Sequence, residues 1–258
     1  MSLTTLEREL AESIGMALEV CEIVKHECRG PLRQLSAVTV DYQYQAIAGL
    51  SIAVKRSDVQ PILAALQPKL IPHGCRAFWS ESSGPDGRKQ SDEIAVAKTD
   101  SDTFILDIRR PNGANYGLSA EDVVNKIQDW KRRSKCQVIG AATDWVAVDF
   151  ETLPDNACRF AEEVYTFCPD TVEQGVGLMN EADDPETFAA ARALCPTLSV
   201  EMQQKIDAQT ARFKQMVLPP QLRQMLDAGM GFNTPTDMGI RLLAYNLDQS
   251  RQLFLWWD

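Results

Sequence analysis

The stretch QVIGAATDWVAVDF, residues 137–150, predicts two β-strands and decides the fold class. The expected strands are Gln137–Gly140 and Trp145–Phe150. In the second of them, Asp149 lies between the apolar residues Val148 and Phe150, and side chains that alternate with a period of two are typical of a strand with one buried face. A sheet is therefore expected in this region.

A helix is expected on each side of these two strands. Before them, Ser119 and Asp122 resemble a capping box at the start of a helix that extends to Arg133. After them, Leu153-Pro154-Asp155 begins the next helix. Turn residues separate further strand-like runs earlier in the chain. These expected strands are Ala37–Asp41, Leu50–Lys55, Arg76–Ser80, Ile94–Ala97 and Thr103–Ile108.

Both ends of the chain are predicted to be mainly helical. Apolar residues recur at steps of three and four from Leu3 to Cys28, which predicts one N-terminal helix. Further helices are expected at 184–194, 199–217, 219–228 and 235–249, and a strand at 253–258. We therefore predict an α+β fold, with a mixed or antiparallel sheet flanked by helices. The expected parts are an N-terminal helix at 1–35, an α+β domain at 36–177 and 236–258, and a helical insertion at 178–235.

Composition argues against several classes of protein. The chain has 258 residues and a net charge of −10, whereas a nucleic-acid-binding protein needs a basic face. The seven cysteines are an odd number at scattered positions, and we interpret them as reduced thiols. No apolar run is long enough to span a membrane, and the start, MSLTTLERELAES, does not resemble a secretory signal. We expect a cytoplasmic protein without a cofactor, with no nucleic acid or membrane among its partners.

Acidic residues concentrate between Asp144 and Thr187, where the sequence has twelve acids and one base, Arg159. A charge distribution of this kind can steer association with a basic partner. The alternative interpretation is a set of solvated helix faces that keep the protein soluble. The residues that we expect to contact a partner are Asp155, Glu162, Glu163, Asp170, Glu173, Asp183, Asp184 and Glu186.

Four motifs in the second half of the chain resemble those of one bacterial family. They are NGANYGLSAEDVV (112–124), VIGAATDWVAVDF (138–150), FAEEVYTFCPDTVEQG (160–175) and LFLWWD (253–258). In content and order they resemble the bacterial family of unknown function catalogued as domain 4253, over roughly residues 100–177 and 240–258. The segment 178–235 departs from the family pattern, in which the chain runs almost directly to the last helix. The resemblance implies a fold and brings no settled activity.

Carboxylates within these motifs form an alternative candidate site. They are Asp144, Asp170, Glu173 and Asp258. Paired carboxylates can act as acid and base or hold a hard cation. Asp170 and Glu173 equally fit the first turn of a helix, where the helix dipole favours acids.

The cysteines offer two further candidate sites, a reactive thiol and a metal site. Cys168 precedes Pro169, and as the N-cap of a helix its thiolate would be stabilised. A nucleophilic cysteine also needs a base nearby, so we favour a packing role. Cys21, His26 and Cys28 do not share one helix face, and we predict no metal site.

We expect a protein-binding protein, an immunity-type inhibitor similar to an antitoxin, that occludes a basic bacterial toxin through its acidic face. This comparison is an analogy with other acidic bacterial domains. The expected partner is a basic protein, such as a cognate toxin encoded nearby. The alternative is a hydrolase or cation-dependent enzyme that uses the carboxylates, although no motif dictates a reaction. A third hypothesis is a homodimer formed through the N-terminal helix.

Overall fold

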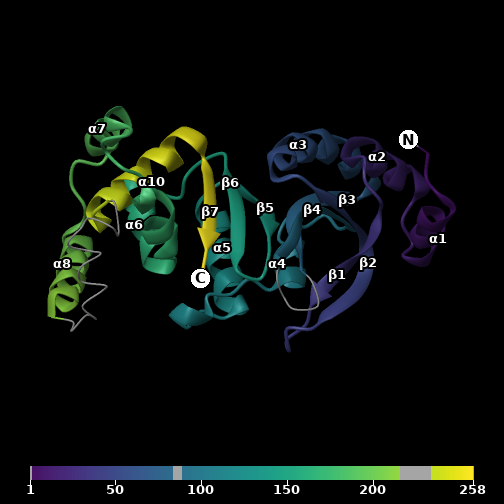
Figure 1. Ribbon diagram of the computed structural model, residues 1–258, viewed down its shortest axis with the longest axis horizontal. Coiled ribbons are helices and arrows are strands. Elements are labelled where there is room, and N and C mark those ends of the chain that lie inside the picture. The colour runs from purple at the N-terminus through teal and green to yellow at the C-terminus, as the bar shows by residue number, and fades with distance from the viewer. Residues whose placement is uncertain (1, 84–88, 216–233, 258) are drawn as a thin grey trace. The chain divides into compact units, whose positions relative to one another are not determined.

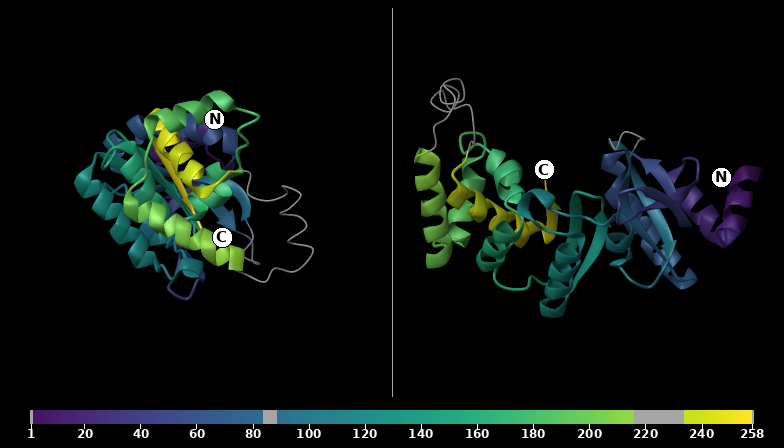
Figure 2. Two further views of the ribbon diagram at one scale, coloured as in Figure 1. Left: turned by 90° about the vertical axis from the view of Figure 1, so that its left-hand side faces the viewer. Right: turned by 90° about the horizontal axis from the view of Figure 1, so that it is seen from below.

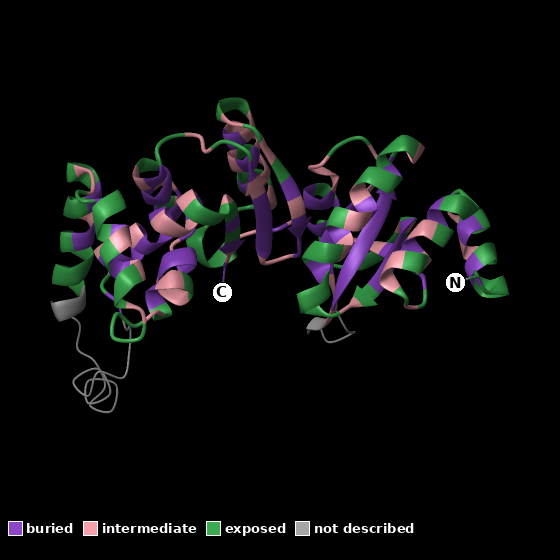
Figure 3. Cartoon of the chain, turned by 90° about the horizontal axis from the view of Figure 1, so that it is seen from above, coloured by how far each residue is buried: buried purple, intermediate pink, exposed green. Residues whose placement is uncertain are grey.

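The computed structural model describes residues 2–83, 89–215 and 234–257, and its elements are labelled in Figure 1. The chain divides into two compact units. The first contains residues 1–127 and 137–148, and the second contains 128–136 and 149–258. Buried residues concentrate on the strands and on the helix faces packed against them (Figure 3). The predicted α+β domain, 36–177 with 236–258, was defined from sequence pattern, whereas the two units are defined from contacts. That domain therefore stays a prediction.

The first unit begins with two helices, α1 (Thr5–Ser13) and α2 (Leu18–Cys28), where a single helix was expected. The chain turns between them at Gly15, whose φ of 66° lies in the left-handed region that favours glycine. A periodic apolar pattern continues across this turn, so the pattern alone could not reveal it. Leu3, Cys21 and Val24 of the apolar stripe are buried within the unit, whereas Leu6 is exposed. The homodimer predicted through this segment stays a prediction.

Glu7 anchors these two helices. It completes a capping box with Thr4, accepts a hydrogen bond from the Lys25 ammonium, and accepts another from the backbone N–H of Leu32 at 3.1 Å. Burial opposes the ionisation of Glu7, but the hydrogen bonds from Lys25, Thr4 and Leu32 outweigh it and lower its pKa to about 2. The carboxylate therefore stays charged inside the fold.

The sheet of the first unit has the strand order β1-β2-β4-β3-β5-β6. Its first four strands are antiparallel, with the buried residues Ile52 and Ile94 paired across β2 and β4. β3 and β5 run parallel and meet at Trp79 and Gly140, where a side chain on Gly140 would collide with the Trp79 backbone. The sheet is therefore mixed and the expected α+β class is confirmed. The strands are β1 (Arg33–Val38), β2 (Tyr44–Val54), β3 (Cys75–Ser83), β4 (Lys89–Lys98), β5 (Cys136–Ala141) and β6 (Trp145–Phe150).

The strand expected at Ala37–Asp41 ends at Val38, because β1 covers Arg33–Val38. The strand expected at Thr103–Ile108 is wrong, because these residues form most of the helix α4 (Phe104–Arg109). A short apolar run does not distinguish a strand from a buried helix. The helix places Arg109 inside the unit, where its guanidinium donates to Glu93, to Ser80 Oγ at 2.6 Å and to the Ser36 carbonyl at 3.1 Å. A charged residue at the end of an apolar run gave no sign of being buried.

Two tryptophans of the first unit stack closely. The ring centroids of Trp79 and Trp145 lie 4.2 Å apart, with an interplanar angle of 36°. The indole N–H of Trp79 donates to Asp92 at 3.0 Å, and that of Trp145 donates to Glu81 at 3.1 Å. The Arg56 guanidinium carbon lies 3.6 Å from the centroid of Trp79, a cation–π contact. These partners fix both indoles in one arrangement.

Two more helices belong wholly or partly to the first unit, and α5 lies where the pattern predicted it. The helix α3 (Val59–Leu70) packs on β3, and short 3₁₀ turns flank it at Arg56–Asp58 and Ile71–His73. The motif at 112–124 forms the 3₁₀ turn Ala114–Tyr116 and the beginning of α5 (Ala120–Arg133). Ser119 and Asp122 make the predicted reciprocal capping contacts, with the Asp122 N–H donating to Ser119 Oγ at 3.2 Å.

The second unit is mainly helical. Figure 1 shows its last helix leading directly into the final strand, and Figure 2 shows that helix from two more sides. The backbone N–H of Phe150, at the end of β6, donates to the backbone carbonyl of Arg251 at 2.8 Å, just before this strand. The expected helix at 219–228 lies outside the described residues. The elements are the end of α5, α6 (Ala157–Phe167), a π-helix (Thr171–Gly175), a 3₁₀ turn (Val176–Leu178), α7 (Pro185–Leu194), α8 (Val200–Gln215), α10 (Thr236–Ser250) and β7 (Gln252–Trp256).

An aromatic cluster forms part of the core of the second unit. Trp130 packs edge-on against Phe160 with ring centroids 5.2 Å apart, and Phe167 packs edge-on against Trp257 at 5.7 Å. Such T-shaped pairs are favourable because the edge of one ring meets the electron-rich face of the other. Across residues 2–83, 89–215 and 234–257, no helix has both the length and the apolar character needed to cross a membrane.

Candidate functional site

A short π-helix, Thr171–Gly175, follows α6 and shapes the candidate site. π-Helical turns are rare and frequently occur at functional sites. The reactive-thiol alternative required Cys168 to cap the start of a helix, whereas Cys168 is the C-terminal cap of α6. Its thiol donates to the carbonyl of Trp256 at 3.0 Å and accepts from the Thr171 hydroxyl at 3.2 Å. Burial raises the pKa of the Cys168 thiol, so it packs as a neutral group.

Glu173 lies on the π-helix and receives a hydrogen bond from a buried tyrosine. The Tyr165 hydroxyl donates to Glu173 Oε1 at 2.9 Å and lies 3.0 Å from Oε1 of Gln209 on α8. Burial, followed by the charge of Glu173, raises the pKa of Tyr165, so the phenol keeps its proton. The Tyr165 ring is buried, and the ammonium nitrogen of Lys205 lies 5.2 Å from its centroid. Tyr165 thus holds the Glu173 carboxylate in one position.

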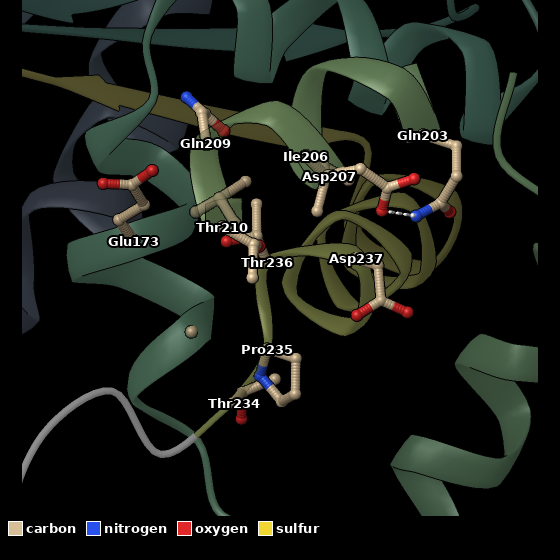
Figure 4. Close-up of a pocket in the computed structure, with 12 residues that line it drawn as sticks. Glu173, Gln203, Ile206, Asp207, Gln209, Thr210, Thr234, Pro235, Thr236 and Asp237 are labelled. Carbon is tan, nitrogen blue, oxygen red and sulfur yellow. Dashed lines mark hydrogen bonds between the residues drawn. The ribbon is translucent and has the colours of Figure 1, made fainter. Parts of the chain in front are cut away.

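A pocket of about 950 Å³ opens between the π-helix, α8 and the start of α10 (Figure 4). Three carboxylates line it, from Glu173, Asp207 and Asp237. Figure 4 shows Thr210 and Thr236 between Glu173 on one side and the two aspartates on the other. None of the described residues that line the pocket is basic. The pocket therefore presents hydrogen-bond acceptors and negative charge to whatever enters it.

The aspartates of the pocket have local partners that fix them. Asp207 accepts a hydrogen bond from Gln203, one turn earlier on α8, at 3.0 Å. Asp237 accepts from the Arg241 guanidinium at 2.9 Å. In the part of the chain that the structure describes, no group of three or more His, Cys, Asp or Glu side chains could hold a metal ion. The arrangement can bind cationic groups, and its described residues contain no nucleophile paired with a base.

The family model described as Domain of unknown function (DUF4253) matches residues 93–258, which is more than half of the chain. The chain belongs to this family. The matched range includes 178–235, the segment in which we expected the chain to depart from the DUF4253 pattern. The comparisons with curated proteins and with solved structures found no match.

The DUF4253 motif at 160–175 contains four of the acids that we expected to contact a partner, and two of them are buried. Glu162 is 7% exposed and accepts from the backbone N–H of Ser199 at 2.7 Å and from Arg159 at 3.3 Å. Asp170 is 2% exposed and accepts from the Gln174 amide at 2.9 Å. Both carboxylates make hydrogen bonds inside the fold. The expectation that these two acids lie on the surface is therefore wrong.

The other two acids of that motif are half-buried. Glu163 accepts from the Trp130 indole at 2.8 Å and from Arg133 at 2.7 Å, which fastens α6 to the end of α5. Glu173 lines the pocket, as described above. A count of charges along the sequence could not separate these acids from exposed ones, because it does not show which acids have hydrogen-bond partners in the fold.

The remaining expected contact residues lie at or near the surface. Asp155, Asp183 and Glu186 are exposed, and Asp184 caps α7 by accepting from the Thr187 N–H at 3.2 Å. Glu181, which we did not single out, is exposed and pairs with Arg192 at 2.7 Å. The acidic surface that remains therefore centres on the start of α7.

The alternative carboxylate set is distributed over the DUF4253 region. Asp144 lies in the first unit between β5 and β6, whereas Asp170 and Glu173 belong to the second unit. Asp258 lies outside the described residues. Asp170 and Glu173 are close in sequence, but they hydrogen-bond to different partners, Gln174 and Tyr165.

Sequence reasoning missed most of the pocket. Its lining on α8 includes Gln203, Asp207 and Thr210, spaced by four and three residues. This spacing places them on one helix face, and such a polar stripe was a readable signal. Tyr165 gave no comparable signal, because its contact with Glu173 depends on the π-helix.

Proposed function

We propose that the protein binds another protein, as an immunity-type inhibitor whose second unit presents an acidic surface to a basic bacterial toxin. The observation that carries this proposal is the pocket lined by Glu173, Asp207 and Asp237, with no basic side chain among its described lining residues. Complementary charge across an interface speeds association and selects the partner.

A smaller pocket shares one carboxylate with this one. Asp237 also lines a smaller pocket of about 480 Å³, to which Glu181 contributes. The two arginines of the smaller pocket, Arg192 and Arg241, pair with Glu181 and Asp237 respectively. The two positive and two negative charges cancel in the smaller pocket, so Glu173 and Asp207 supply the unpaired negative charge of the proposed surface.

A lysine or arginine side chain of the partner fits the chemistry of the larger pocket. Val172 and Ile206 supply apolar wall for the methylene stem of such a side chain. The carboxylates of Glu173 and Asp207 and the hydroxyl of Thr210 would accept hydrogen bonds from its charged head. By covering basic residues of a toxin in this way, the protein would occlude a cationic active site.

The proposal is tested by binding kinetics with the product of the neighbouring gene, at two salt concentrations. Asp207→Asn removes one charge from the pocket while keeping the shape of the side chain. We expect it to weaken binding roughly three- to tenfold, mainly through slower association, with the difference shrinking at high salt.

The matched control is Glu201→Gln, at an exposed acid on α8 that does not line the pocket. Its binding should stay within about twofold of the unchanged protein. Equal weakening by both substitutions would contradict a role for the pocket. A neighbouring product that does not bind at all would overturn the immunity function.

A further inference from the structure

Cys158 and Cys195 come from separate segments of the second unit and lie close together. Cys158 lies in the first turn of α6, and Cys195 is the C-terminal cap of α7. The Cys158 thiol donates to the carbonyl of Leu194, the residue before Cys195, at 3.4 Å. This contact places the Cys158 thiol next to Cys195, close enough to affect the ionisation of the Cys195 thiol. Both cysteines are free thiols.

The two thiols differ in their access to solvent. Cys158 is partly exposed, whereas Cys195 is completely buried. Burial, followed by the hydrogen bond with Cys158, raises the pKa of Cys195 to about 12. A small oxidant therefore reaches Cys158 first, and Cys195 is placed to react with the product.

Packing holds both segments in place around this pair. The Arg241 guanidinium donates to the carbonyl of Cys195 at 2.9 Å and to that of Pro196 at 3.3 Å. On the side of α6, Glu162 accepts from the backbone N–H of Ser199 at 2.7 Å. Because these contacts already bring the two segments together, a covalent bond between the thiols needs little chain movement.

We propose that Cys158 and Cys195 form a redox-active pair that closes to a disulfide when Cys158 reacts with a hydroperoxide. Cys158 Sγ attacks the O–O bond, so that an S–O bond forms, the O–O bond breaks, and the alcohol leaves with a proton. The resulting sulfenic acid on Cys158 is attacked by Cys195 Sγ, which forms the S–S bond and releases water. Two thiols are oxidised and one hydroperoxide is reduced to one alcohol and one water.

Closure would tie α6 to the end of α7. The bond would enclose residues 159–194, which include the π-helix, Glu181 and the acidic start of α7. A disulfide limits the conformations open to the unfolded chain, so the oxidised protein should be the more stable form. This inference does not depend on the proposed binding function.

Peptide mapping after treatment with hydrogen peroxide tests the proposal. Remaining thiols are alkylated, and the protein is cut with trypsin and an Asp-specific protease. Trypsin cuts after Arg159 and Arg192 and so separates the two thiols, while a cut before Asp155 separates Cys158 from Cys136. We expect a linked pair of peptides containing Cys158 and Cys195, lost on reduction, and a melting temperature about 5–10 °C higher after oxidation.

Variants make the result specific. Cys158→Ser and Cys195→Ala should each abolish the linked peptides and the rise in melting temperature. Cys136→Ser is the matched control, because Cys136 is also partly exposed, and it should leave both unchanged. The proposal is overturned if peroxide leaves both thiols free for alkylation, or converts Cys158 to a sulfinic acid without a linked peptide.

The rate of closure supplies a second readout. The charged or titratable groups that face Cys195 are Cys158 and Glu162 on α6 and Arg241 on α10. Because Cys195 must lose its proton to attack, the linked form should accumulate faster as the pH rises from 7 to 9. A rate that stayed constant over this range would contradict closure by thiolate attack.

Discussion

Glu7 carries a negative charge inside the first unit, and its side chain is only 6% exposed. Its neighbours outweigh the cost of burial and lower its pKa from 4.5 to about 2. A group whose folded pKa is depressed contributes stability that is complete above its unfolded pKa. That contribution is lost as the pH falls from about 4.5 towards 2.

Replacing Glu7 with glutamine should destabilise the protein, because it leaves the Lys25 ammonium, which is 12% exposed, without its charged partner. We expect a loss of about 1–3 kcal/mol in the free energy of unfolding at pH 7. The melting temperatures of the two proteins should converge as the pH is lowered below about 4.5. Thermal unfolding at a series of pH values measures this.

Glu12→Gln provides the control on the same helix, since Glu12 is exposed. It should change stability by less than about 0.5 kcal/mol. A difference between Glu7→Gln and the unchanged protein that stayed constant down to pH 2 would contradict the lowered pKa.

Residue roles could be predicted only where they follow from local sequence. Ser119 and Asp122 lie three positions apart, and their capping contacts were predicted from that spacing. Glu162 and Glu163 are adjacent in the sequence, yet one is buried against Ser199 and the other is held by Trp130. The difference depends on contacts more than 30 residues away in the sequence, so charge counting could not show it.

At the scale of elements, β7 and the next residue, Trp257, have one buried face and one partly exposed face. Leu253, Leu255 and Trp257 are buried, whereas Phe254 is 38% exposed. Trp257→Ala should therefore destabilise the protein by about 3–5 kcal/mol, since it removes a large ring that packs edge-on against Phe167. Chemical denaturation followed by far-UV circular dichroism measures the loss.

Phe254→Ala is the matched control on the opposite face of the same strand. We expect it to cost less than half as much, because much of its ring already contacts water. Equal losses for the two variants would mean that the terminal strand does not bury one face.

Elements with strong periodicity were predicted well. The helix α5 and the strands β5 and β6 lie where the pattern places them, as do α7, α8 and α10. The failures have specific physical causes. Gly15 breaks an apolar stripe that reads as continuous, and the run at 103–108 is too short to reveal its period. The π-helix after α6 has no sequence signature of its own, and the pocket depends on it.

At the scale of the whole molecule, the net charge of −10 predicts that nucleic acids will not bind. Binding to phosphates gains free energy from the release of condensed counterions, which requires basic side chains in a row. Gel-shift titration at low salt should show no saturable complex with duplex or single-stranded DNA below about micromolar concentration. A saturable complex in that range would contradict the prediction.

The fold class was predictable and the division into units was not. Strand-like runs, helical runs and the DUF4253 motifs each point to an α+β protein. The boundary between the units falls within α5 and β6, which read as uninterrupted elements in the sequence. Contacts between parts of the chain that are distant in sequence define this division, and the local pattern does not show them.

The stacked pair of Trp79 and Trp145 gives the first unit an optical signature of its own. Two indoles held 4.2 Å apart at a fixed tilt couple their electronic transitions, which produces a paired positive and negative band in circular dichroism. The other tryptophans, Trp130, Trp256 and Trp257, belong to the second unit. Changing Trp145 to phenylalanine would remove the paired band while leaving those three in place. The band can then be followed during heating to learn whether the first unit melts together with the second or at a temperature of its own.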